Sequence, residues 1–433
     1  MIRILALMVS FLLINVCGGT GQRSEVSGTS PKVEFRPEDG GFSMYLDGEP
    51  FFIKGAVGWD FLDELAASGA NSLRTGPRLL DEAHRLGLRV LVNLPIRAER
   101  DGFDYDDPEA VKAQYERVKN IVEENRDHPA ILMWAIGNEL DHIPGNLDYN
   151  LRVWDAVNDI AAMIKRIDPV HPVLTVVGVG EHEKGKFEVI RERCPDLDLL
   201  GINGYADIVN VPGWLREFGW DRPYAVTEWG PSGWWEVPRT DQGIVIEETS
   251  TEKARVYRER YENVILADPL CVGSYVFLWT SNRQERTHTW FNMFHNGLRT
   301  QTVEVMQYMW TGEWPDNLAP RIESITIDGR KATDDVVLSA GSTATARVEC
   351  YDPDGDELSF EWELLPEPES FAPYAGQGET KPEPVEGFLM SAPDNEIQFE
   401  VPAGESRNYR LFVYVYDDNG NVANANIPFH VKH

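Results

Sequence analysis

The chain has few cysteines and few positive charges, and each shortage excludes a class of protein. Apart from Cys17 near the start of the chain, the cysteines are Cys194, Cys271 and Cys350; they are odd in number and widely spaced, so they give neither a disulfide framework nor a metal-ligand spacing. The histidines show no HxH or HExxH pattern, so no metal site is predicted. Lysine and arginine total 40 against 71 acidic residues, a net charge of −31. Nucleic acid is excluded as a partner because its phosphates would be repelled, and a neutral substrate fits best.

Long hydrophobic runs are also scarce, and the longest opens the chain. Arg3 precedes the apolar stretch Ile4–Ile14, which is too short to span a membrane as a mature helix. The pattern predicts a signal peptide over residues 1–17 and a flexible Gly/Ser/Thr-rich tether over 18–31. Ile14-Asn15-Val16-Cys17 resembles a bacterial lipobox, so we expect an exported periplasmic or outer-membrane lipoprotein. A lipid anchor on Cys17 would be its contact with the membrane, and plain secretion is the alternative.

A β-then-α rhythm follows, and it predicts a (β/α)8 TIM barrel over residues 32–314, entered through an N-terminal hairpin. A doubly wound sheet is the alternative, but the glycine-rich phosphate loop that would follow its first strand is absent. The eight apolar runs that we interpret as barrel strands are Phe51–Val57, Ser72–Thr75, Arg89–Leu94, Ile131–Ile136, Val173–Val177, Leu199–Ile202, Tyr224–Thr227 and Val272–Leu278.

Beyond a linker at Trp314–Pro320, the pattern changes to short alternating strands separated by Asp/Gly-rich turns. This predicts an all-β immunoglobulin-like sandwich over residues 320–433. Residues 367–386 are dense in Pro, Glu and Gly, and we expect an exposed loop there. Asp352, Asp354 and Asp356 are candidate Ca²⁺ ligands, although Asp-Gly turns between strands are the commoner explanation. No other cofactor is predicted.

Two glutamates end buried apolar runs, which is an unusual place for a carboxylate. Glu139 closes the fourth predicted strand and Glu228 the seventh, and both strand ends face the same mouth of a barrel. An ionised carboxylate is costly in a core, so each strand end is expected to open into a site. Retaining glycosidases use such a pair, with one acid to protonate the leaving oxygen and one carboxylate to attack the anomeric carbon. Asn138 is suited to hydrogen bonding the sugar 2-hydroxyl.

These strand ends resemble those of clan A glycoside hydrolases, and above all the barrel domain of glycoside hydrolase family 2. The resemblance lies in "HPAILMWAIGNE" at 128–139, "VTEWG" at 226–230 and "NSLRTG" at 71–76. It implies that Glu139 is the acid/base, that Glu228 is the nucleophile, and that Asn138 and Arg74 support them. A structural ion pair within the barrel is the alternative for Arg74. A degenerate barrel that binds sugar or only scaffolds is the alternative for the pair, but such a barrel would usually have lost one carboxylate.

Aromatic residues are abundant near the same strand ends. The resemblance implies that Tyr205 in "GINGY" contacts the nucleophile and that Trp279 in "FLWTS" forms the floor of the −1 subsite. Trp234-Trp235, in a loop just past Glu228, is the pair favoured for stacking on pyranose rings. Each of these aromatics has ordinary core packing as its alternative. His288, near Trp290, is a candidate for the cleft lining.

The order of domains separates the chain from typical family 2 enzymes, which carry β-domains before the barrel. A barrel followed by a sandwich is similar to smaller bacterial families such as family 158, which is associated with endo-β-1,3-glucanases. The resemblance therefore implies a retaining β-glycosidase of a neutral glycan, with β-1,3-glucan as the best candidate. A β-glucanosyl transglycosylase and a non-catalytic surface glycan-binding lipoprotein are the two rivals.

Overall fold

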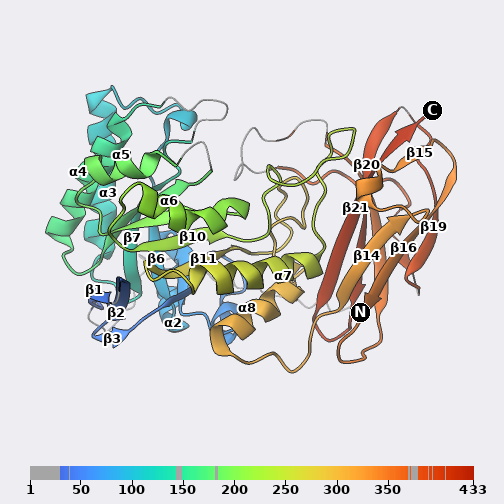
Figure 1. Ribbon diagram of the computed structural model, residues 1–433, viewed down its shortest axis with the longest axis horizontal. Helices are drawn as coiled ribbons and strands as arrows, with labels where there is room; N and C mark the ends of the chain where they lie inside the picture. The colour runs from blue at the N-terminus through green and yellow to red at the C-terminus, as the bar shows by residue number, and fades with distance from the viewer. Residues whose placement is uncertain are drawn as a thin grey trace, which may run out of the picture.

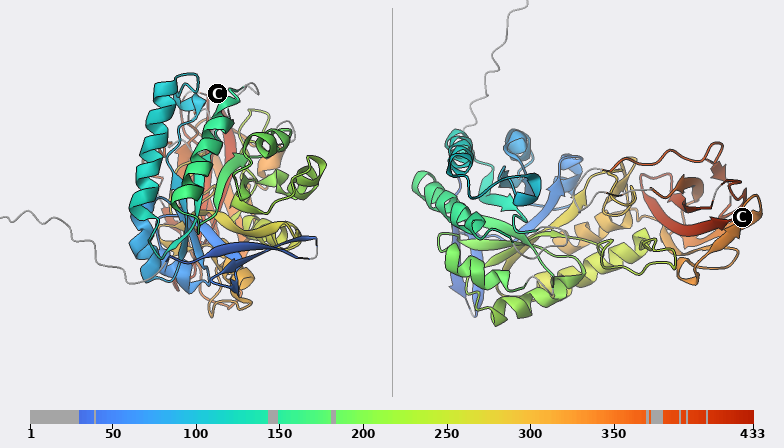
Figure 2. Two further views of the ribbon diagram at one scale, coloured as in Figure 1. Left: turned by 90° about the vertical axis from the view of Figure 1, so that its left-hand side faces the viewer. Right: turned by 90° about the horizontal axis from the view of Figure 1, so that it is seen from above.

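The structure is a computed structural model that describes residues 30–433 except 39, 143–148, 181–183, 369–370, 372–378, 389, 393 and 405. A helix-rich barrel forms one end of the molecule and a strand-rich C-terminal part forms the other (Figures 1 and 2). The predicted signal peptide, the lipidation site at Cys17 and nearly all of the tether lie outside the described residues. Within the described ranges, no helix is long and apolar enough to cross a membrane.

Eight parallel strands close into the predicted TIM barrel, in which chain order is also the order around the barrel. Each predicted strand is present to within about two residues, as expected for sequence-based boundaries. The strands are β4 (Ile53–Gly58), β5 (Ser72–Thr75), β6 (Arg89–Leu94), β7 (Ile131–Asn138), β8 (Val173–Gly178), β9 (Leu199–Asn203), β10 (Tyr224–Trp229) and β11 (Cys271–Trp279). Strand β7 is buried along almost its whole length, which explains its unbroken apolar sequence.

Helices cover the outside of the barrel, and their buried apolar faces form one core with the strands. The longest, α3, begins at Pro108, where the Asp107 side chain accepts the backbone N–H groups of Glu109 and Ala110. The helices are α1 (Leu62–Ala67), α2 (Leu80–Arg85), α3 (Pro108–Asn125), α4 (Arg152–Ile167), α5 (Lys186–Arg193), α6 (Val211–Glu217), α7 (Ser250–Arg260) and α8 (Gln301–Thr311).

The entry hairpin closes the end of the barrel at which the strands begin. It consists of β1 (Val33–Glu38) and β2 (Gly41–Leu46), with the short β3 (Glu49–Pro50) beside β2. Val33 and Met44 join the apolar cluster inside the barrel, and the Phe42 N–H donates to the Pro269 carbonyl at 2.9 Å. This end is therefore packed and plugged, so a site must lie at the opposite, carboxyl end of the strands.

The C-terminal part consists of two sheets around a separate apolar core. One sheet has the order β14-β16-β19 and the other β15-β21-β20-β17-β18. Strands β15 and β18 were not predicted because they are only three residues long. The strands are β14 (Arg321–Ile327), β15 (Val337–Ser339), β16 (Thr343–Tyr351), β17 (Ser359–Pro366), β18 (Met390–Ala392), β19 (Glu396–Glu400), β20 (Arg407–Tyr416) and β21 (Val422–Lys432). We call this part the β-domain.

The β-domain is joined to the barrel by buried polar contacts as well as by the chain. Glu247, in the loop before α7, accepts from Lys253 at 2.5 Å and from Asn426 of β21 at 2.7 Å. Arg410 of β20 donates to the Val245 carbonyl at 2.8 Å. Helices α7 and α8 lie on the side of the barrel that faces the β-domain (Figure 1). The two parts therefore meet through specific hydrogen bonds that fix their relative orientation.

Candidate active site

A cavity of about 690 Å³ opens at the carboxyl end of the barrel strands, and both predicted catalytic glutamates line it. Glu139 directly follows β7, and Glu228 lies on β10 with 15% of its side chain exposed. Of the other predicted residues, Asn138, Tyr205, Trp234 and Trp235 line the same cavity. The structure thus brings together side chains that come from strands and loops far apart in the sequence.

Arg74 of β5 lies beneath the cavity, 2% exposed, and binds both catalytic strand ends. Its Nη1 donates to Glu228 Oε1 at 2.8 Å, and its Nη2 donates to Asn138 Oδ1 at 2.6 Å. The same Nη1 also reaches the Thr227 carbonyl at 3.0 Å. A planar guanidinium can make these bonds in several directions at once, whereas a lysine ammonium has no such fixed fork. Arg74 is therefore an ion-pair partner and a site residue together.

Asn203, at the end of β9, connects the second glutamate to the same network. Its Nδ2 donates to Glu139 Oε1 at 2.7 Å and to Asn138 Oδ1 at 3.1 Å. Its Oδ1 accepts from the Thr227 hydroxyl at 2.9 Å. Asn203 was not predicted from the sequence. It does end an apolar run, as Glu139 and Glu228 do, and this position could have identified it. The same signal would have found Asn93 near the end of β6, which accepts from Arg74 Nε at 3.1 Å.

The turn after β7 is shaped to aim Glu139 into the cavity. Glu139 has φ 48, in the left-handed region that non-glycine residues seldom adopt. Its N–H donates to the Val176 carbonyl at 2.8 Å, and the buried side of the turn is held by Arg100, which donates to the carbonyls of Asn138 and Glu139. A Cβ at Gly178 would lie 3.2 Å from Glu139 Oε1, so glycine there leaves room for the carboxyl group.

The charge state of the pair follows from its surroundings. Burial raises the pKa of Glu228 to about 7; the Arg74 guanidinium lowers this pKa, and the nearby Glu139 carboxylate raises it. Burial also raises the pKa of Tyr205 well above its ordinary value. The Tyr205 hydroxyl therefore keeps its proton and donates to Glu228 Oε2 at 3.3 Å. The Glu228 carboxyl group can thus retain its proton close to neutral pH.

Aromatic side chains form the upper rim of the cavity. Trp235 is 44% exposed, and its ring meets Tyr205 edge-on at 5.2 Å and Trp234 edge-on at 5.3 Å between centroids. Trp59, which is 51% exposed, lines the cavity as well. Exposed aromatic faces at the rim of a concave site are suited to stacking on the apolar faces of sugar rings.

The structure corrects the expectation for Trp279. This residue is fully buried between Phe294 and Trp310, and its Nε1 donates to the Phe61 carbonyl, so it belongs to the core and does not line the cavity. The pairing of β11 with β4 shifts register between Val276 and Trp279, which changes the face to which the last residues of the strand point. Phe277 and Leu278 line the cavity in its place.

The structure also corrects the expectation that His288 lines the cleft. It is 1% exposed, its Nε2 lies 2.6 Å from the Tyr414 hydroxyl of the β-domain, and burial holds its pKa well below the ordinary value. It therefore lies in the contact with the β-domain and does not line the cleft. Trp229 and Trp290 are likewise buried.

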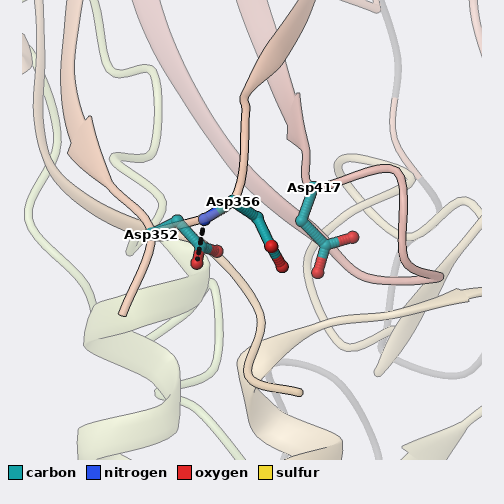
Figure 3. A group of neighbouring side chains, drawn as sticks. All are labelled: Asp352, Asp356 and Asp417. Atoms are coloured by element: carbon teal, nitrogen blue, oxygen red, sulfur yellow. Dashed lines mark hydrogen bonds between the residues drawn. The ribbon is translucent and has the colours of Figure 1, made fainter. Parts of the chain in front are cut away.

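A possible cation site lies in two turns of the β-domain, outside the residues that line the cavity (Figure 3). Asp352, Asp356 and Asp417 have carboxylate oxygens within 4.8 Å of one another. Asp354 accepts instead from the Leu318 N–H at 2.7 Å. Asp356 accepts from the amide of Asn419 at 2.8 Å, and Asp417 from the backbone of Asn421 at 3.0 Å. These hydrogen bonds account for the cluster as turn structure, and Ca²⁺ binding stays a prediction.

An eight-stranded barrel with glutamates at the ends of its fourth and seventh strands is the arrangement expected from the resemblance to clan A glycoside hydrolases. Comparison with known proteins gives likenesses to the same kind of enzyme. A family model described as "Glycosyl hydrolases family 2, TIM barrel domain" matches residues 74–219. Residues 74–219, about a third of the chain, are thus similar to the barrel domain of that family.

The curated relatives align with only part of this chain, and the aligned region is a small share of each relative's own length. Beta-galactosidase 2 of Enterobacter cloacae is 27% identical over 177 residues, which is 40% of this chain and 14% of the relative. A beta-galactosidase of Yersinia enterocolitica is 26% identical over 184 residues, 42% of this chain and 14% of the relative. The chain therefore spans about a seventh of the length of these relatives. Among solved structures, an FMN-binding beta-glucuronidase of Facaelibacterium prausnitzii matches with a TM-score of 0.47 and 15% identity, over 93% of this chain and 59% of that one.

Proposed function

We propose that the protein is a retaining β-glycoside hydrolase that acts on a neutral glycan by double displacement. Glu139 protonates the leaving oxygen while Glu228 attacks the anomeric carbon and forms a glycosyl-enzyme. Glu139 then removes a proton from water, which displaces Glu228 and releases the sugar. The observation that carries this proposal is the network of Arg74, Asn138 and Asn203, which binds both carboxyl groups at the floor of one cavity.

The division of roles is supported by the partners of each carboxyl group. Glu228 receives a guanidinium at 2.8 Å and a phenolic hydroxyl at 3.3 Å, both of which stabilise an anion. Glu139 receives the neutral amide of Asn203. When Glu228 is ionised, the guanidinium and the hydroxyl therefore stabilise the anion that attacks the anomeric carbon.

The charge of the cavity supports a neutral substrate. Its described lining holds five carboxyl groups, Glu139, Asp207, Glu228, Glu236 and Glu285, and one arginine, Arg283. Arg283 is paired with Glu285 at 2.9 Å, which offsets its charge. A uronic acid would bring a further carboxylate into this negative field, at a cost that grows as water is excluded.

Within neutral sugars, β-1,3-glucan is the best candidate because of the likeness in layout to family 158. β-Galactosides are the second candidate, since the curated relatives are named beta-galactosidases. A transglycosylase would use the same two glutamates and differ only in the acceptor that meets the glycosyl-enzyme. Longer oligosaccharide products would indicate transfer, and only shorter ones hydrolysis. A non-catalytic surface glycan-binding protein would bind the glycan without releasing reducing sugar.

We also propose an immunoglobulin-like fold for the β-domain and export of the protein from the cytoplasm. An immunoglobulin-like fold for residues 320–433 is supported by two packed sheets of three and five strands. We further propose export as a lipoprotein anchored through Cys17, in the periplasm or at the outer membrane. Radiolabelled fatty-acid incorporation that is lost in Cys17→Ser would support the anchor, and secretion of an unlabelled mature protein would contradict it.

The central experiment assigns the roles of the two glutamates separately. The wild type is assayed on aryl β-glucoside, aryl β-galactoside, aryl β-glucuronide and laminarin. Glu228→Ala and Glu139→Ala are then assayed on the best aryl glycoside with added azide. Azide should restore product as the α-glycosyl azide in Glu228→Ala, where it replaces the missing nucleophile, and as the β-glycosyl azide in Glu139→Ala, where it attacks the glycosyl-enzyme. Full activity of Glu228→Ala without azide would contradict the assignment.

A further inference from the structure

Arg286, in the loop after β11, lies between the barrel and the β-domain and contacts an aromatic ring of the cavity rim. Its guanidinium carbon lies 3.7 Å from the ring centre of Trp234 on one side and 4.1 Å from that of Phe371 on the other. Only 8% of its side chain is exposed. A guanidinium that is desolvated between two ring faces gains more from each contact than an exposed one does.

Glu379 of the β-domain holds this arginine in place. Its Oε1 forms an ion pair with Arg286 Nη1, and its Oε2 accepts the Arg286 backbone N–H at 2.6 Å. The carboxylate thus fixes both the side chain and the backbone of one residue. The backbone bond matters because Arg286 has φ 61, a conformation that needs support in a non-glycine residue.

Trp234 packs against a buried apolar cluster that includes Tyr205 and Phe291, but it also faces two cavities. It lines the catalytic cavity and also a second cavity of about 170 Å³ at the junction of the two domains. A side chain between two cavities lacks the close packing that fixes a core residue in one rotamer. Its buried Nε1 has no hydrogen-bond partner among the described residues. The stack with Arg286 is therefore one of the contacts that restrain the orientation of this ring.

The β-domain is positioned firmly enough to transmit this restraint. Arg410 donates to the Val245 carbonyl at 2.8 Å, and Asn426 donates to Glu247 at 2.7 Å, both in the loop that follows the Trp234-Trp235 pair. Arg410 is itself paired with Glu367 at 2.6 Å. These bonds are buried, so the loop is attached to the β-domain at points separate from Arg286.

We propose that Glu379 is a positioning residue through which the β-domain sets the aromatic rim of the catalytic cavity. Glu379 holds Arg286 against Trp234, and Trp234 in turn supports Trp235 in edge-on contact. The rim then binds sugar units of a neutral glycan beyond the one that is cleaved. This part of the inference depends on the proposed glycosidase function. The β-domain accordingly contributes to the substrate site through the contact of Glu379 with Arg286. A domain that served only as a spacer would not need this contact.

The first test does not depend on activity. In protein labelled with ¹⁵N-tryptophan, the indole signal of Trp234 is assigned with Trp234→Phe and followed in Glu379→Gln and Glu379→Ala. The control is Lys381→Gln, which lies two residues away in the same segment and breaks the ion pair with Glu363 at 2.7 Å without contacting Arg286. The Trp234 signal should move in both Glu379 variants, further in Glu379→Ala, and stay in place in Lys381→Gln. An unmoved signal in Glu379→Ala, or equal movement in the control, overturns the proposal.

The second test compares substrates of different length. Glu379→Gln should raise KM about tenfold for the longest oligosaccharide cleaved and leave kcat within about twofold. The KM for an aryl glycoside, which occupies little of the rim, should change far less. Lys381→Gln should change neither. Equal changes on both substrates would indicate general loosening of the domains and contradict the proposal. If the wild type cleaves no glycoside, the proposed function fails, while the indole signal still decides the role of Glu379.

Discussion

Glu228 in the cavity and Glu247 at the domain junction are both buried glutamates beside a cation. Their environments nevertheless shift the carboxyl pKa in opposite directions. Glu228 faces an open cavity, and burial raises its pKa to about 7 in spite of Arg74. Burial also acts to raise the pKa of Glu247, but Lys253 and Arg410 lower it below the ordinary value. The difference lies in how completely each carboxylate is satisfied.

Glu247 has a partner on each oxygen. Lys253 and Thr289 donate to Oε1, at 2.5 and 2.8 Å, and Thr287 and Asn426 donate to Oε2, at 2.6 and 2.7 Å. Glu228 has one cation and one hydroxyl and faces a space large enough for a sugar. A buried charge that is fully bonded stabilises the fold, whereas one that is incompletely bonded beside a cavity is available for chemistry.

The largest expected effect is on turnover. Glu228→Gln should lower kcat on an aryl β-glycoside by about 10⁴-fold or more, because the nucleophile is lost, while the fold is retained. Glu247→Gln should keep near wild-type turnover at low temperature in the fraction that stays folded. The measurement is kcat with circular dichroism on the same samples. Comparable losses of turnover in the two folded variants would remove the distinction between the two sites.

The loss of stability should be larger in Glu247→Gln than in Glu228→Gln, which is the reverse of the order expected for turnover. Glu247→Gln leaves Lys253 buried without its counter-charge, so the free energy of unfolding should fall by about 3–5 kcal/mol. Chemical denaturation at neutral pH measures this. Lys253→Met together with Glu247→Gln provides the matched control, since removing both charges should recover much of the loss. A loss below about 1 kcal/mol in Glu247→Gln would show that the junction does not depend on this pair.

The sequence predicted the barrel and the catalytic pair because both depend on local patterns. Apolar runs of strand length identify parallel strands, and a glutamate that ends such a run is visible without any knowledge of tertiary contacts. Chain order is also barrel order, so the fourth and seventh strands were known to meet at one mouth. Arg74 and Tyr205 were found through the resemblance and line or support the same cavity.

Features that depend on side-chain direction or on long-range pairing were not predictable. Trp279 was misplaced because the resemblance assigned its role from its position in the strand, and the register shift near the end of β11 is not visible in the sequence. Glu247, Arg286 and Glu379 carry no motif, and each has a partner across the junction between the barrel and the β-domain, so only the packed structure reveals them. Asn203 was missed for a different reason, since its position at a strand end was visible and was not used.

Replacing Arg74 should change the pKa of Glu228 and with it the pH dependence of catalysis. Arg74→Met removes the cation that lowers the pKa of Glu228, so kcat/KM should fall about 100-fold and its acidic limb should move to higher pH. Arg74→Lys keeps the charge but cannot bridge Glu228 and Asn138 together, so its acidic limb should move less. The pH dependence of kcat/KM from pH 4 to 9 measures both. An acidic limb that stays in place in Arg74→Met would contradict this account.

The smallest expected effect is a pH-dependent gain in stability on removing the catalytic charge. The pKa of Glu228 is higher in the folded protein, about 7, than its ordinary value of 4.5. Its contribution is therefore complete below the lower value and is lost as the pH rises through the higher one. Relative to the wild type, Glu228→Gln should gain about 1–3 kcal/mol between pH 5 and pH 8. Glu247, with its lowered pKa, has the opposite sign, because its contribution is lost only as the pH falls. Because that loss begins only below about pH 4.5, Glu247→Gln should show almost no slope between pH 5 and pH 8. Denaturation of both variants at these two pH values measures the slopes, and a slope as large in Glu247→Gln as in Glu228→Gln would show that the two carboxylates do not differ as proposed.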